Sequence, residues 1–198
     1  MRRDTRESDS SPREDLVRRA IGHFTVHGIG DTSLRGIAAA LETSHRMLIY
    51  HFGSREGLLA ALVSSLRRDL ENALVEMAGT PGESLRDVVW RYWSTLIAPT
   101  SIAPLLFELS VPAMRDAPWA DSFREGSAAW TAGLAALLRR AGEPEERAVI
   151  VARMSMSVVR GVLWELAITG DRTAADATMH AFVDAHWPNR PIGDPATS

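Results

Sequence analysis

Hydrophobic residues in the first third of the chain repeat with the spacing of consecutive helices. The first segment has its apolar positions three or four residues apart, at Leu16, Ala20, Ile21 and Phe24. Gly28 and Gly30 follow this segment, and glycine is the residue that most often ends a helix. The pattern predicts a first helix from about residue 13 to this pair of glycines.

Two shorter segments follow, and each is preceded by a serine that can cap a helix. Ser33 precedes an apolar stripe formed by Leu34, Ile37, Ala38 and Leu41. Ser44 precedes a segment in which Leu48 and Phe52 lie four residues apart on one face. Because helices this short are marginal in isolation, we expect the three to pack around one small core.

The rest of the chain has the pattern of longer helices. An amphipathic run extends from Arg55 to Met77 and ends before a turn at residues 79–82. Further helical segments cover residues 83–97, 101–115, 118–141, 144–169 and 171–187, and no segment alternates convincingly like a strand. The predicted fold class is therefore all-α, with about nine helices in total.

The outward side of the third helix carries side chains that suit a DNA groove. Its inward positions are taken by Leu48 and Phe52, and the positions left for solvent are His45, Arg46, Met47, Ile49 and Tyr50. Such residues can donate hydrogen bonds, pair with phosphate and contact thymine methyl groups, and a helix of this length fits the major groove. We therefore predict a helix-turn-helix centred on residues 33–51.

Charge and composition limit where DNA can bind and what chemistry is available. The net charge is −3, but residues 1–68 hold 11 arginines and 8 acidic residues, whereas residues 69–198 hold 11 arginines and 17 acidic residues. Only the first third can present cationic surface to DNA. The absence of cysteine excludes disulfides, thiolate metal sites and cysteine nucleophiles. No segment has the length of a membrane span or the pattern of a signal peptide, so a cytoplasmic protein without a membrane partner is expected.

Residues 13–63 resemble the DNA-binding domain of TetR-family transcription regulators. The resemblance rests on a spaced set of residues: Ala20, Phe24, Gly28, Thr32-Ser33, Ile37-Ala38, Tyr50-His51-Phe52, Ser54-Arg55-Glu56 and Leu58-Leu59. It implies that the DNA backbone is contacted by Ser33, Tyr50, His51 and Arg55, and that the bases face Arg35, His45, Arg46 and Met47. Ser44, the predicted cap of the third helix, completes this DNA-binding set. Arg46 is the candidate for reading guanine, because an arginine fork matches the O6 and N7 atoms of that base.

Three positions depart from the family pattern. Glu42 stands where the turn usually has glycine, so a backbone position that can require positive φ is held by a less tolerant residue. Ile49 replaces a frequent tyrosine and removes a hydroxyl. Arg55 replaces lysine, which keeps the positive charge.

The large apolar side chains beyond the predicted DNA-binding domain at residues 12–57, which we call the head, are candidates to line a ligand cavity. All six tryptophans lie outside the head, and an ordinary core would also account for them. The resemblance implies an apolar chamber between helices, for which the candidate lining is Trp90, Trp93, Ile97, Leu105, Phe107, Met114, Phe123, Trp130, Met154 and Trp164.

The segment from Ala148 to Ile168 is apolar nearly all round, so we expect it to be buried on more than one side. It is either an internal helix or part of a subunit interface. The resemblance implies pairing of the last two long helices of each subunit in a homodimer, with candidate interface residues Val151, Val158, Val162, Leu166, Met179, Phe182 and Val183.

The expected domains are a disordered arm at 1–11, a helix-turn-helix DNA-binding domain at 12–57, a helical ligand-binding and dimerisation domain at 58–187 and a loose tail at 188–198. The expected function is a ligand-responsive repressor that binds a palindromic operator in double-stranded DNA as a dimer and is released by a small apolar or aromatic effector, with the helix from Arg55 to Met77 as the lever. No cofactor is expected.

Two other classes of protein are alternatives to this interpretation. One is a helical small-molecule-binding protein without operator binding, which the departures at Glu42 and Ile49 would favour. The other is an all-α enzyme, but the chain contains no phosphate-binding loop, nucleophile elbow or zinc-protease motif. A metal site is not expected, because Glu42 and His45 fall across a turn, and His180 and His186 point to different faces of one helix.

Overall fold

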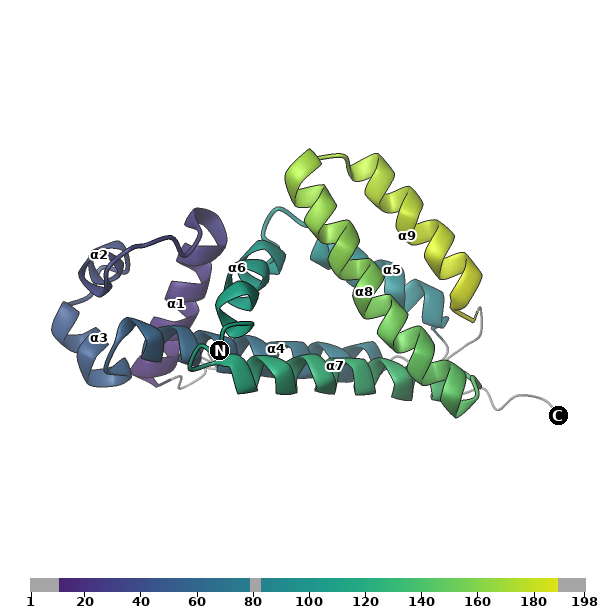
Figure 1. The fold of residues 1–198 in the computed structure, drawn as a ribbon, viewed down its shortest axis with the longest axis horizontal. Helices are drawn as coiled ribbons and strands as arrows, with labels where there is room; N and C mark the ends of the chain where they lie inside the picture. The colour runs from purple at the N-terminus through teal and green to yellow at the C-terminus, as the bar shows by residue number, and fades with distance from the viewer. Residues whose placement is uncertain (1–10, 79–82, 189–198) are drawn as a thin grey trace, which may run out of the picture.

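The computed structural model describes residues 11–78 and 83–188, and this part of the chain folds into nine α-helices (Figure 1). The all-α fold class is therefore confirmed. The arm and the tail predicted from sequence lie outside the described residues, except for Ser11 and Pro188. Among the described helices, none combines the length and the hydropathy needed to cross a bilayer.

The first three helices form the head: α1 (Pro12–His27), α2 (Leu34–Ala40) and α3 (His45–Phe52). Serine caps begin all three, because the side chains of Ser11, Ser33 and Ser44 each accept a hydrogen bond from a backbone amide three residues later. Capping fixes where each helix starts, and thereby which side chains of α3 point outward.

The turn between α2 and α3 has the conformation expected from the family pattern. Glu42 has a φ of 48°, in the left-handed region that glycine adopts most easily. Arg19 of α1 donates a hydrogen bond to the Leu41 carbonyl, at the end of α2. The turn is therefore held from α1 as well as by its own residues.

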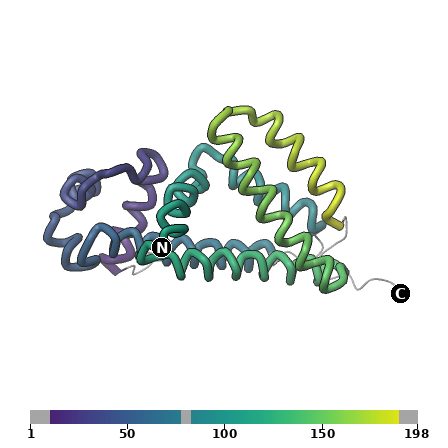
Figure 2. Tube along the Cα trace, viewed as in Figure 1, coloured from purple at the N-terminus to yellow at the C-terminus, as the bar shows by residue number. Residues whose placement is uncertain are grey.

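Six longer helices form the body: α4 (Arg55–Ala78), α5 (Leu85–Leu96), α6 (Ala103–Ala113), α7 (Ala120–Arg140), α8 (Glu145–Thr169) and α9 (Arg172–His186). The helices α4 and α7 run side by side, and α6 and α8 rise from opposite ends of this pair (Figure 1). The Cα trace shows the head at one end of the molecule and α9 on the outer side of α8 (Figure 2).

Buried apolar residues gather in two clusters, one for each region. The head cluster includes Phe24, Ile37 and Leu48, and it extends to Leu66 of α4 and to Leu105 and Leu109 of α6. The body cluster is formed by the rest of α4, by α5 and α7–α9, and by Ala103 of α6. The core of the head therefore extends beyond residue 57, the predicted end of the DNA-binding domain, because α4 and α6 each contribute buried residues to it.

Candidate DNA interface and ligand cavity

The outward face of α3 is fully presented to solvent. His45, Arg46, Met47, Ile49 and Tyr50 are all exposed, with Tyr50 at 78%. Leu48 and Phe52 are buried and anchor the opposite face. The guanidinium of Arg46 makes no ion pair or hydrogen bond with the described residues, so this face holds a cation that is available to a ligand.

The beginning of α2 lies on the exposed surface of the head as well. Ser33 and Arg35 are exposed, and Arg35 is also without a partner among the described residues. The Ser33 hydroxyl accepts a hydrogen bond from the Gly36 amide at 3.3 Å, and the Ser44 hydroxyl accepts one from the Met47 amide at 3.1 Å. Both serines are helix caps, and their contacts with DNA stay predictions.

Arg55 makes hydrogen bonds within the head, and its contact with the DNA backbone stays a prediction. Its Nε donates to the Thr32 carbonyl at 3.0 Å and its Nη2 to the Gly30 carbonyl at 2.6 Å. Because two of its nitrogens donate to the loop between α1 and α2, Arg55 joins the start of α4 to the head.

The predicted phosphate contact of His51 stays a prediction. Its side chain is half-buried, and Nε2 is buried without a hydrogen-bond partner among the described residues. Its carbonyl accepts a long hydrogen bond of 3.4 Å from Arg13, whose guanidinium lies 5.2 Å from the centre of the Phe52 ring.

A cavity of about 1250 Å³ lies within the body. It is lined by residues of α4–α9 and by Trp187, which directly follows α9. Five of the predicted residues line it: Trp93, Phe107, Met114, Phe123 and Trp130. Met114 is 77% exposed, so the cavity reaches the surface beside the end of α6. Its volume exceeds that of most pockets for drug-sized molecules.

The other five predicted residues lie elsewhere. Leu105 is buried in the head cluster, because α6 turns this side chain toward the head. Trp164 is 59% exposed on the outer side of α8. Trp90 stacks on His180 of α9, with ring centroids 3.9 Å apart, and Ile97 and Met154 pack against the body cluster away from the cavity wall.

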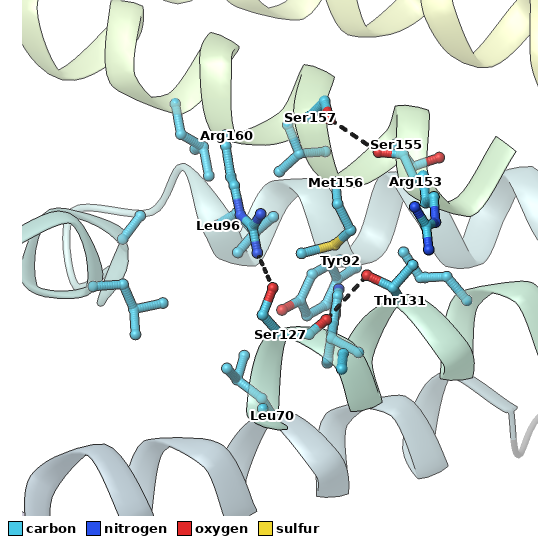
Figure 3. A pocket seen from close by; sticks show the side chains of 18 of the residues that line it. Leu70, Tyr92, Leu96, Ser127, Thr131, Arg153, Ser155, Met156, Ser157 and Arg160 are labelled. Carbon is cyan, nitrogen blue, oxygen red and sulfur yellow. Dashed lines mark hydrogen bonds between the residues drawn. The ribbon is translucent and has the colours of Figure 1, made fainter. Parts of the chain in front are cut away.

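Polar residues that the sequence interpretation missed form one wall of the cavity (Figure 3). Arg160 reaches from α8 to Ser127 of α7, where its Nη2 donates to the hydroxyl at 2.7 Å. Arg153, also on α8, and Thr131, on α7, line the same cavity. In the sequence, the signal for this polar wall is the pair Arg153 and Arg160, which interrupts an otherwise apolar stretch of α8.

Tyr92 of α5 adds a hydroxyl to this wall. Its ring lies 5.2 Å from that of Trp130, and its hydroxyl has no hydrogen-bond partner among the described residues. Burial raises the pKa of Tyr92 well above its ordinary value of 10.0. The hydroxyl therefore stays protonated and can donate to a ligand.

Most of the predicted interface residues are buried within the single chain, and their place in a dimer stays a prediction. Val151, Val162, Met179, Phe182 and Val183 are all buried, whereas Val158 and Leu166 are half-buried. The exposed residues of α8 that do not line the cavity include Ile150, Gly161, Trp164 and Ile168. Small residues face outward on α9: Ala174, Ala177, Ala181 and Ala185. Periodicity in a helix that is apolar nearly all round does not tell which side faces its own subunit.

Within the described ranges, no group of three histidine, aspartate or glutamate side chains is arranged to hold a metal ion. The described surfaces present a cationic helix face on the head, and an apolar cavity with a hydrogen-bonding wall in the body.

The helix-turn-helix head matches a known protein family. Residues 16–62 match the family described as "Bacterial regulatory proteins, tetR family". The head of this chain therefore carries a domain of the TetR family of bacterial regulatory proteins.

Several solved structures share the fold over nearly the whole chain. A TetR transcriptional regulator from Legionella pneumophila has a TM-score of 0.76 at 18% identity, covering 90% of this chain and 99% of the other. SmeT, the repressor of a multidrug efflux pump of Stenotrophomonas maltophilia, has a TM-score of 0.63 at 16% identity, covering 96% and 97%. The multidrug binding protein EbrR complexed with ethidium has a TM-score of 0.63 at 20% identity, covering 87% and 96%. A search of curated proteins finds no match.

Proposed function

We propose that this chain is a ligand-responsive repressor that binds a palindromic operator as a dimer. The observation that carries the proposal is the outward face of α3, where Arg46 has no partner in the described chain and stands beside exposed His45 and Tyr50. An arginine in this position can donate two hydrogen bonds to guanine in the major groove. Arg35, exposed at the start of α2, adds a second free cation to the same head.

Dimerisation places two heads on successive turns of the duplex. The outward stripe of α8, with Trp164 and Ile168, and the small outward residues of α9 suit a four-helix interface with a second copy. The alanines of α9 allow helices to approach closely, and the exposed tryptophan supplies area to bury. A symmetric pair of heads requires a palindromic operator.

Ligand and DNA are linked through two helices that touch both regions. The first half of α4 packs in the head, and Leu70 and Met77 in its second half line the cavity. On α6, Leu106 and Phe107 line the cavity, and Glu108 accepts a hydrogen bond from the Ile29 amide of the head at 2.7 Å. A small apolar or aromatic effector that fits the cavity better when these helices shift would lower operator affinity by its difference in affinity for the two states.

The first experiment is selection of binding sites from random duplexes, followed by titration of the selected operator. Arg46→Ala should weaken operator binding by about 1–3 kcal/mol and relax the preference at one base pair. Arg91→Ala, which removes an exposed arginine of α5 paired with Glu83, is the matched control and should leave binding unchanged. Absence of a selected sequence would favour a helical ligand-binding protein without an operator.

The dimer has its own test in sedimentation equilibrium. Trp164→Glu should shift the protein toward the monomer, because it buries a charge in the proposed interface. Val111→Glu changes a residue of α6 that is also exposed in the single chain and should leave the dimer intact. If the two variants show the same oligomeric state, the outward face of α8 is excluded as the dimer interface.

A further inference from the structure

The lining of the body cavity has an uneven charge. Four arginines line it, and none of the lining residues is acidic: the arginines are Arg67, Arg124, Arg153 and Arg160. Most of the remaining lining is apolar or aromatic. The cavity therefore combines an apolar interior with positive charge on its wall.

Two of these arginines are neutralised by acidic residues outside the cavity lining. Arg124 pairs with Asp116 and with Asp121, each at 2.7 Å. Arg67 lies 3.6 Å from Glu71 and 3.7 Å from Glu125. Their charges are balanced before any ligand arrives.

Arg153 and Arg160 have no acidic partner in the described part of the chain. They are seven residues apart, which places them on one face of α8, about 10 Å from each other along the helix. Arg160 donates only to the neutral hydroxyl of Ser127. Desolvation lowers the pKa of Arg160, even though the side chain remains open to solvent on the cavity side. A guanidinium that has lost some of its water and has no counter-ion is stabilised by an incoming anion.

We infer that the effector is an apolar carboxylate, with its acid group bound by Arg160 and Ser127 and its apolar body among Trp93, Phe107 and Trp130. The inference rests on the proposed function and names the class of its effector. The planar guanidinium matches a carboxylate with two parallel hydrogen bonds, and the Ser127 hydroxyl can donate a third. A lipophilic cation, such as the ethidium bound by EbrR, would meet arginines here and no acidic residue in the lining.

Three probes of equal chain length separate the charge of a ligand from its apolar area. Decanoate, decan-1-ol and decylammonium are titrated into the full chain at pH 7.5, and tryptophan fluorescence and calorimetry report binding. Decanoate should bind at least about tenfold more tightly than either of the others, because a hydrogen bond to a charged group exceeds one to a neutral group by that order. Decylammonium binding as tightly as decanoate, or no decanoate binding, would overturn the inference.

A pair of variants tests the contact assigned to Arg160. Arg160→Gln should weaken decanoate about tenfold or more and leave decan-1-ol unchanged. Arg124→Gln removes a lining arginine that is already paired, so it should change decanoate binding far less. Equal losses in the two variants would show that only the overall charge matters and would contradict the assigned contact.

The result is separable from that of the DNA experiment. Charge-selective binding of decanoate without any selected operator would refute the repressor and leave the cavity assignment intact. Operator binding combined with probes that bind irrespective of charge would refute the cavity assignment alone.

Discussion

The head and the body use opposite sides of their helices for binding. In the head, the core is filled with apolar side chains and the binding groups stand outside, as Leu48 and Arg46 on α3 illustrate. In the body, α8 turns Arg160 to a cavity and exposes Trp164 on its outer face. Polar groups on the outside are the ordinary state of a soluble protein. Only the exposed arginines without partners in the described chain distinguish the head from other small domains. On α8 a charged side chain faces the cavity and a tryptophan faces solvent, and this unusual distribution indicates a binding site more directly than the polar surface of the head does.

The largest expected effect compares a filled core with a hollow one. Phe24 is 1% exposed in the head cluster, whereas Phe107 is half-buried and borders the cavity. Phe24→Ala should reduce the free energy of unfolding by about 3–5 kcal/mol, because it opens a new cavity in packed surroundings. Phe107→Ala only enlarges an existing space and should cost about 1–2 kcal/mol. Urea denaturation of both variants measures the difference, and equal losses would mean that the body is packed as densely as the head.

The same contrast explains what the sequence predicts well. The caps at Ser33 and Ser44 and the spacing of Leu48 and Phe52 are local signals, so the helices of the head and their outward residues follow from short stretches of chain. The positive φ of Glu42 was also expected, from comparison with a family pattern.

The walls of the body depend on contacts between residues far apart in sequence. Trp164 was assigned to the cavity and lies outside, because a helix apolar on nearly every side has no periodicity that distinguishes its faces. Small residues on the inward side, Ala148, Ala152 and Ser155, mark where α8 packs closely. Leu105 was misplaced for another reason, since α6 serves both regions and its register decides which one each residue joins.

A smaller effect tests the connection between the two regions. Glu108→Ala removes the acceptor for the Ile29 amide and should cost about 1 kcal/mol of stability, because a hydrogen bond to a partly exposed carboxylate is lost. The same variant should reduce the loss of operator affinity that a bound effector causes. Glu76→Ala, at an exposed position of α4, serves as the control. Unchanged coupling in Glu108→Ala would leave α4 as the only lever.

The pH dependence of stability tests how far the cavity wall is withdrawn from water. Burial raises the pKa of Tyr92 in the folded protein above its unfolded value of about 10. The contribution of this group is fully present below pH 10 and is lost as pH rises further, because only the unfolded chain then releases the proton. Between pH 10 and 11 the free energy of unfolding should fall more steeply for the wild type than for Tyr92→Phe, by at most about 1.4 kcal/mol per pH unit. Parallel curves would indicate that water reaches the hydroxyl freely.

The smallest expected effect lies in the turn of the head. Glu42 adopts a φ of 48°, which costs a side-chain-bearing residue about 1–2 kcal/mol relative to the right-handed region. Glu42→Gly removes this strain but gives the unfolded chain more freedom, a loss of roughly 0.5–1 kcal/mol. The net gain in the free energy of unfolding should be about 0.5–1 kcal/mol. Glu42→Gln keeps the strained backbone and removes only the charge, so it should gain less. If Glu42→Gln stabilises as much as Glu42→Gly, the relevant cost at this position is the negative charge beside the DNA-binding face, and operator affinity should then rise in both variants alike.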